Sequence, residues 1–112
     1  MKRDMELIRS ILLIIEADKE PNYDDGTILY HLNLLHEAGL IEGQPICMDQ
    51  GELPIKWSDL RLTWEGHEFL DAARDDTVWR KALAKVGPTV TSLTFAIFKS
   101  VLESVIKGQV GL

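Results

Sequence analysis

The sequence predicts an α+β fold that is mostly helical, with one two-stranded hairpin set between helices. Apolar residues recur at three- and four-residue steps in four segments, which is the period of an amphipathic helix. Two short runs rich in Ile, Trp and Leu flank "DQGELP", whose Gly and Pro favour a turn, so these runs predict the hairpin. A chain of 112 residues has room for one core and one appended element.

The first two predicted helices are separated by a turn. The first ends near Asp18, because "ADKEPNYDDG" brings a Pro and a cluster of turn residues. The second has Ile28, Leu32 and Leu35 on one face, and Gly39 supplies the positive φ that ends it. The N-cap candidates of the second helix are short oxygen-bearing side chains: Asp24, Asp25 and Thr27.

The segment after Gly39 predicts a hairpin followed by further helices. The strands are "GLIEGQPICM" and "PIKWSDLRLT", and Thr63 is expected to cap a helix that begins at Trp64. The apolar phase shifts at "RDDT", so we expect a break near residues 75–76, and a last helix over about 91–107. Trp64 and Trp79 are expected to close the core. Trp57 is expected to cover the hairpin, although an exposed Trp57 would instead indicate a contact surface.

Helix, turn, helix, hairpin, helix is the order of a winged helix, here with an extra C-terminal helix. The pattern of His31-Leu32, Leu35 and "AGLI" resembles the recognition helix and strand of bacterial regulators of the arsenic-repressor type. More closely, the run from "MKRDMELIRSILL" through "YHLNLLHEAGLI" to "RLTWEGHEFLDAARDDTVW" is similar to a bacterial and phage family, domain of unknown function 2513, over about residues 1–80. The resemblance implies a winged-helix fold and carries no activity with it. We expect the winged-helix domain to span residues 1–87, and residues 88–112 to form a C-terminal helix that serves as a dimerisation element. It departs from the regulators between Asp18 and Thr27, where there is scarcely room for the usual helix before the recognition helix.

Charge is distributed unevenly along the chain, whose net charge is −6. Residues 1–19 are neutral overall, and residues 20–76 hold three basic against thirteen acidic side chains, a net −10. Residues 77–112 hold five basic side chains against one acidic, a net +4. The middle of the chain is therefore an acidic module and the tail is basic.

The outer face of the predicted recognition helix carries side chains that can read bases. Asn33 can make a bidentate contact to adenine, Tyr30 or His36 can touch phosphate, and Leu29 can meet a thymine methyl group. Glu37 opposes such contacts, and an ordinary solvated helix face is the alternative interpretation. The phosphate contacts of a DNA complex would come from the basic tail: Arg80, Lys81 and Lys85.

Catalytic, metal and cofactor sites are not predicted. His31 and His36 are five residues apart and share no zinc spacing with Cys47 or His67. The acid pairs at residues 24–25 and 75–76 are typical of helix caps, and no nucleophile, general base or phosphate loop accompanies them. Because these catalytic motifs are missing, we expect a protein that is not an enzyme. A poor signal-peptide pattern, no membrane span and a single cysteine lead us to expect a cytoplasmic protein.

The last predicted helix has two apolar stripes, and one packing face requires only one. The first stripe is Leu93, Ile97 and Val101. The second, which we assign to a two-fold homodimer interface, is Phe95, Phe98, Leu102 and Val105. The alternatives are that both stripes enter one monomeric core, or that the helix lies on a membrane surface.

Two functions are compatible with the sequence. The first is a dimeric winged-helix transcriptional regulator that binds duplex DNA, and the resemblance favours it. The second is a non-catalytic adaptor of phage or prophage type whose acidic surface docks a basic protein, and the charge favours it. Fold analogy places the regulator first.

Overall fold

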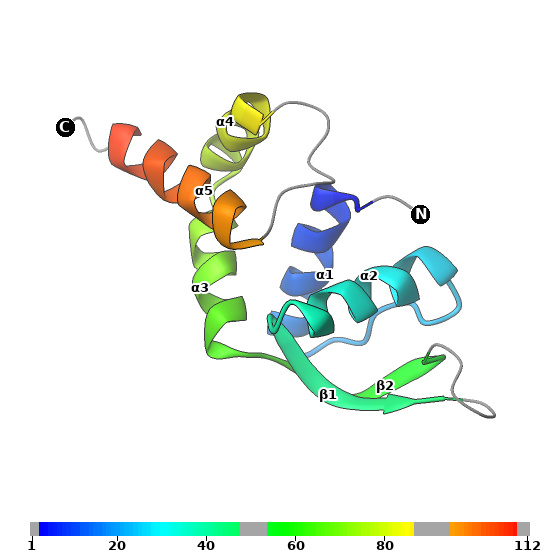
Figure 1. Ribbon diagram of the computed structural model, residues 1–112. Helices are drawn as coiled ribbons and strands as arrows, with labels where there is room; N and C mark the ends of the chain where they lie inside the picture. Colours follow the sequence, from blue (N-terminus) through cyan, green and yellow to red (C-terminus); the bar gives the residue numbers. More distant parts are fainter. Residues whose placement is uncertain (1–2, 48–53, 87–94, 110–112) are drawn as a thin grey trace. The chain divides into compact units, whose positions relative to one another are not determined.

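The computed structural model describes residues 3–47, 54–86 and 95–109. The chain forms two compact units, residues 1–67 and 68–112. Within the described ranges there are five helices and one two-stranded antiparallel sheet (Figure 1), an α+β architecture that is mostly helical, as predicted. The order of elements is consistent with a winged-helix-like fold.

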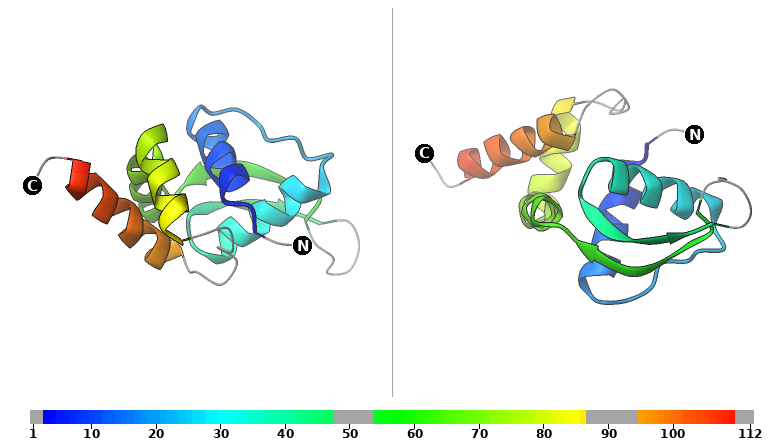
Figure 2. Two further views of the ribbon diagram at one scale, coloured as in Figure 1. Left: turned by 90° about the horizontal axis from the view of Figure 1, so that it is seen from above. Right: turned by 60° about the horizontal axis from the view of Figure 1, so that its bottom comes forward.

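The first unit is built from two helices and a hairpin. Helix α1 spans Met5–Glu16 and α2 spans Gly26–Glu37, while strands β1 (Ile41–Ile46) and β2 (Lys56–Leu62) pair antiparallel. Both helices contact the hairpin, α1 through β2 and α2 through β1 (Figure 2). The core between them contains Ile8, Ile11, Leu12, Leu32, Leu35, Leu40, Ile41, Trp57 and Leu62.

The helix ends of this unit are set by the side chains that the sequence predicts for them. Of the three cap candidates, Asp25 is the N-cap of α2, and its carboxylate accepts a 2.8 Å hydrogen bond from the Thr27 backbone N–H. Gly39 leaves the helix with a φ of 77°. Residues 17–25 contain no helix, so α2 follows α1 through a turn alone, as the short spacing predicts.

A bulge bends the hairpin beside α2. The register runs Glu42 with Arg61 and then Gln44 with Ser58, so one residue of β1 faces two of β2. Asp59, one of those two, has a φ of 56°, which is the left-handed region that Asp tolerates. Gly43 fits opposite because a Cβ there would lie 2.9 Å from the Ser58 carbonyl oxygen.

Helix α3 (Trp64–Ala73) begins in the first unit and continues into the second, which also holds α4 (Asp76–Val86) and α5 (Phe95–Gln109). Asp75 caps α4 at the predicted break, accepting from the backbone N–H groups of Thr77 and Val78. Phe98 packs against Phe69 and Trp79. The division therefore lies at 67/68 rather than at the predicted 87/88, because α5 and the preceding helices share one core.

Trp64 differs from its prediction. Its side chain is 76% exposed, whereas Trp57 and Trp79 are buried. The buried side of α3 carries Gly66, Phe69, Leu70 and Ala73. Residues two positions apart in a helix are separated by about 200° around its axis, so Trp64 lies on the opposite face from Gly66.

Candidate functional site

The predicted base-reading residues of α2 share one side of the helix. Leu29, Tyr30 and Asn33 are half-buried and His36 is exposed. Leu32 and Leu35 fix this orientation, because both are fully buried in the core. The structure thus brings the four predicted side chains together along the outer part of α2.

Several of these side chains already have partners. The Asn33 amide donates a 3.2 Å hydrogen bond to the Glu37 carboxylate. The ring of His36 lies against Trp57, with centroids 4.9 Å apart, and Tyr30 meets the edge of His31. The amide group best suited to reading adenine is therefore held by a carboxylate.

His31 has a structural role at the core side of α2. It is fully buried, and its Nε2 accepts a 2.8 Å hydrogen bond from the backbone N–H of Asp4. Its Nδ1 therefore carries the proton and donates to the Thr27 carbonyl oxygen at 2.8 Å. The sequence predicts a packing histidine here. The hydrogen bond from Asp4 to His31 could not be predicted, because no spacing in the sequence indicates it.

A groove of about 520 Å³ separates the C-terminal end of α2 from the bulged hairpin. It is lined by His36, Glu42, Gly43, Gln44, Asp59 and Arg61. Arg61 donates a 2.8 Å hydrogen bond from Nε to the Glu42 carboxylate. This hydrogen bond is the larger cause, and the negative charge of Glu42 the smaller cause, of a raised pKa of Arg61. Among the described residues of the lining, Arg61 is the only basic one apart from the histidine, and it is already paired with a carboxylate.

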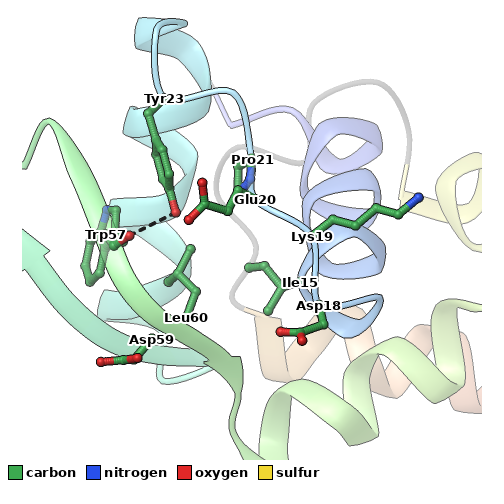
Figure 3. Close-up of a pocket in the computed structure, with 9 residues that line it drawn as sticks. All are labelled: Ile15, Asp18, Lys19, Glu20, Pro21, Tyr23, Trp57, Asp59 and Leu60. Atoms are coloured by element: carbon green, nitrogen blue, oxygen red, sulfur yellow. Dashed lines mark hydrogen bonds between the residues drawn. The ribbon is translucent and has the colours of Figure 1, made fainter.

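A second cavity of about 200 Å³ lies between the 18–23 segment and β2 (Figure 3). The Tyr23 hydroxyl crosses it to donate to the Trp57 carbonyl oxygen at 3.1 Å, and burial, followed by the charge of Glu20, raises the pKa of Tyr23. The acidic residues that line it are Asp18, Glu20 and Asp59. Lys19 also lines the cavity, but Figure 3 shows its chain extending away from them. No sequence pattern predicts this cavity, because its walls come from segments about forty residues apart.

The predicted phosphate-binding residues lie in the second unit. Arg80, Lys81 and Lys85 are all exposed on α4, in which Val78, Trp79 and Ala82 are buried. The structure therefore places these cations on one helix face as a group of their own. They belong to a different unit from the α2 residues with which the sequence associates them.

The predicted dimer interface is corrected by the packing of α5. Phe98, Leu102 and Val105 are 1%, 0% and 5% exposed within the chain, and Phe98 packs against rings of α3 and α4. These three residues fill the core of the second unit, so they do not form a free surface for a partner. The side chain of Phe95 and the residues 91–94 lie outside the described residues.

The described ranges show neither a metal-binding cluster nor a membrane-spanning helix. No group of three or more His, Cys, Asp or Glu side chains there is placed to hold a metal ion, and Cys47 is exposed and free. None of the helices described has the length and apolar character needed to cross a bilayer. The indole Nε1 of Trp57 is buried without a hydrogen-bond partner among these residues.

Comparisons with known proteins agree with the resemblance seen in the sequence. A family model described as "Hypothetical protein (DUF2513)" matches residues 2–92. The chain is also similar to a protein of Haemophilus influenzae named "Uncharacterized protein", with 37% identity over 117 residues that cover 95% of this chain and 96% of the relative. No solved structure matches the chain. The family model and the relative cover most of the sequence, and the chain belongs to the family of domain of unknown function 2513.

Proposed function

We propose that this chain is a non-catalytic interaction module that docks a basic protein partner on the outer face of its first unit. The observation that carries the proposal is that the polar donor groups on this face are already hydrogen-bonded to carboxylates. The Asn33 amide is bonded to Glu37, and the guanidinium of Arg61 in the adjoining groove is bonded to Glu42. Carboxylates thus define the charge of the surface that a winged-helix regulator would present to DNA.

The electrostatics favour an ammonium or guanidinium partner over a phosphate. Lys and Arg contacts supply essentially all of the non-specific affinity of a protein for DNA. Residues 20–55 contain neither residue type, and the first unit as a whole has six basic and thirteen acidic side chains, a net −7. Complementary charge speeds encounter with a basic partner and selects against an anionic one.

The test uses a lysine- and arginine-rich peptide as the probe and compares two doubly neutralised variants. Glu37→Gln with Glu42→Gln removes the acidic groups of the α2 face and groove, and we expect the affinity for the peptide to fall about ten-fold or more. Glu65→Gln with Asp71→Asn changes the net charge by the same amount on α3 and is expected to have a much smaller effect. Equal effects of the two variants would indicate only a general attraction to net charge and would contradict a docking face at α2.

Duplex DNA binding by a regulator is the second candidate, and the exposed cations of α4 favour it. Arg80, Lys81 and Lys85 can supply phosphate contacts that the first unit lacks. The hydrogen bond that occupies Asn33 is exposed, so its exchange for an adenine edge costs little. In this arrangement Tyr30 and His36 contact the backbone and Leu29 meets thymine.

Selection from random duplexes at low salt tests the DNA candidate. Replacing the three α4 cations with Gln should abolish binding to all sequences, whereas Asn33→Ala should alter only the sequence preference. Retention by the unmutated protein should also fall steeply as salt rises. No enriched sequence together with no salt-dependent retention would eliminate the regulator.

A further inference from the structure

Helix α4 presents a cationic face that the proposed docking of a basic protein does not use. Arg80, Lys81 and Lys85 are exposed, as are Thr77 and Ala84, whereas Val78, Trp79 and Ala82 are buried. Over the described ranges the three cations make no ion pair, while Lys99 of the same unit pairs with Glu68 and Glu103. The acidic residue of α4, Asp76, stands in its first turn. Among the described residues, the exposed side of α4 is therefore a positively charged helix surface without ion pairs.

The first unit offers a surface of matching chemistry. Asp18, Glu20 and Asp59 line the cavity between the 18–23 segment and β2, and none of them is ion-paired within the described residues. Lys19 also lines the cavity, but Figure 3 shows its side chain extending away from the carboxylates of Asp18 and Glu20. The volume of about 200 Å³ is sufficient for the head group of one lysine or arginine side chain.

We propose that the α4 face of one copy docks on this cavity in a second copy of the chain. Both halves of the contact lie on one chain: the exposed cations of α4, and a cavity lined by three acidic residues with room for one such head group. The net charge of −6 on each copy opposes association. Salt at physiological strength screens charges beyond about 8 Å, so the short-range pairs between α4 cations and cavity carboxylates determine whether two copies associate.

The contact is heterologous, since one copy contributes α4 and the other contributes the cavity. A two-fold dimer uses the same patch on both subunits, whereas a head-to-tail contact leaves one free α4 face and one free cavity at the ends of each assembly. Association should therefore rise with protein concentration without stopping at a dimer. It should also weaken as salt rises.

Sedimentation velocity of the unmutated chain and two variants tests the proposal. The α4 variant is Lys81→Gln with Lys85→Gln. The cavity variant is Asp18→Asn with Asp59→Asn, and Asn is chosen because both positions have positive φ, which Asn tolerates. The unmutated chain is expected to associate at low salt and dissociate at high salt, and each variant alone is expected to be monomeric. Circular dichroism checks that both variants remain folded.

Mixing the two variants gives the decisive measurement. The α4 variant keeps an intact cavity and the cavity variant keeps an intact α4 face, so the mixture is expected to form a one-to-one heterodimer that grows no further. Lys56→Gln with Lys107→Gln is the matched control, because it removes two exposed cations outside α4 and should leave association unchanged.

Three results would overturn the proposal. They are a monomeric unmutated chain at all salt and protein concentrations, association that survives in either variant, and a mixture that stays monomeric. Binding of random duplex DNA by the unmutated chain but not by the α4 variant, without self-association, would identify nucleic acid as the occupant of α4 instead. None of these results depends on the lysine- and arginine-rich peptide, so failure of the self-association can be distinguished from failure of the proposed function.

Discussion

Gly66 is buried where the first turn of α3 passes over the backbone of Leu40. A Cβ at this position would overlap the Leu40 carbonyl oxygen, which is a backbone atom and cannot rotate away. The Gly66 backbone N–H also donates to the Thr63 hydroxyl at 3.0 Å, and this hydroxyl donates in turn to the Gly39 carbonyl oxygen. One missing side chain thus allows α3 to start beside the end of α2.

Gly66→Ala is expected to destabilise the fold by about 2 kcal/mol or more, because the added methyl group forces a backbone shift. Gly26→Ala is the matched control. Nothing lies within 4 Å of a Cβ at Gly26, and alanine favours a helix, so its free energy of unfolding should be unchanged or slightly higher. Urea denaturation of both variants measures the difference. Equal midpoints would refute the close approach of α3 to Leu40.

His31 is the second position at which a single side chain determines packing. His31→Phe keeps the ring volume but leaves the Asp4 N–H without its acceptor, so we expect a loss of about 1–3 kcal/mol. His36→Phe serves as the control, because His36 is exposed and a phenyl ring can keep the contact with Trp57. If both substitutions reduced the unfolding free energy equally, the bond from Asp4 to His31 would contribute nothing of its own.

At the scale of elements, the caps and turns were predictable and the partners of α5 were not. Asp25, Gly39 and Thr63 act on their own neighbourhood, so local sequence contains what determines them. The stripe of Phe98 and Leu102 is apolar whether it faces a second subunit or its own core. Only the position of the Phe69 and Trp79 rings, which is a tertiary property, decides between the two.

Substitutions in α5 should reflect this packing. Phe98→Ala is expected to cost about 3–5 kcal/mol, because it leaves a cavity between two aromatic rings. Ile97→Ala, at a residue that is 49% exposed, should cost about 1 kcal/mol or less. Thermal unfolding followed by circular dichroism gives both values. If Phe98→Ala left the stability unchanged and altered only the oligomeric state, the result would contradict the core position of Phe98 and would support the predicted dimer interface.

For the molecule as a whole, the order of elements and the acidic middle followed from the sequence, but the sites did not. The groove beside α2 depends on a bulge at Asp59, and the cavity in Figure 3 joins Asp18 to the same residue across the fold. Neither juxtaposition has a periodic or spacing signal. Trp64 was misplaced for a related reason, because the phase of α3 is set by the close approach at Gly66.

The stability of the whole fold should fall in alkaline solution through Tyr23. Burial, and then the charge of Glu20, raise the pKa of its hydroxyl above the ordinary 10.0, so the folded chain holds this proton more tightly than the unfolded chain. The resulting stabilisation is complete below pH 10.0 and is lost as the pH rises through the raised value. Urea denaturation at increasing pH should show a steeper decline for the unmutated chain than for Tyr23→Phe. Tyr30→Phe should keep the steeper decline, and identical curves for all three proteins would contradict the shift.

The hydrogen bond from the Asp4 amide to His31 makes one proton a reporter of helix docking. Asp4 precedes α1, and the amide of a helix N-cap ordinarily exchanges with solvent within the intrinsic time of an open chain. Here the acceptor belongs to α2, twenty-seven residues away, so the amide is sheltered only while the two helices stay together. Its rate of deuterium uptake therefore measures how often α1 and α2 separate in the native protein. Without this acceptor, the exchange of the Asp4 amide would report only the fraying of the end of α1.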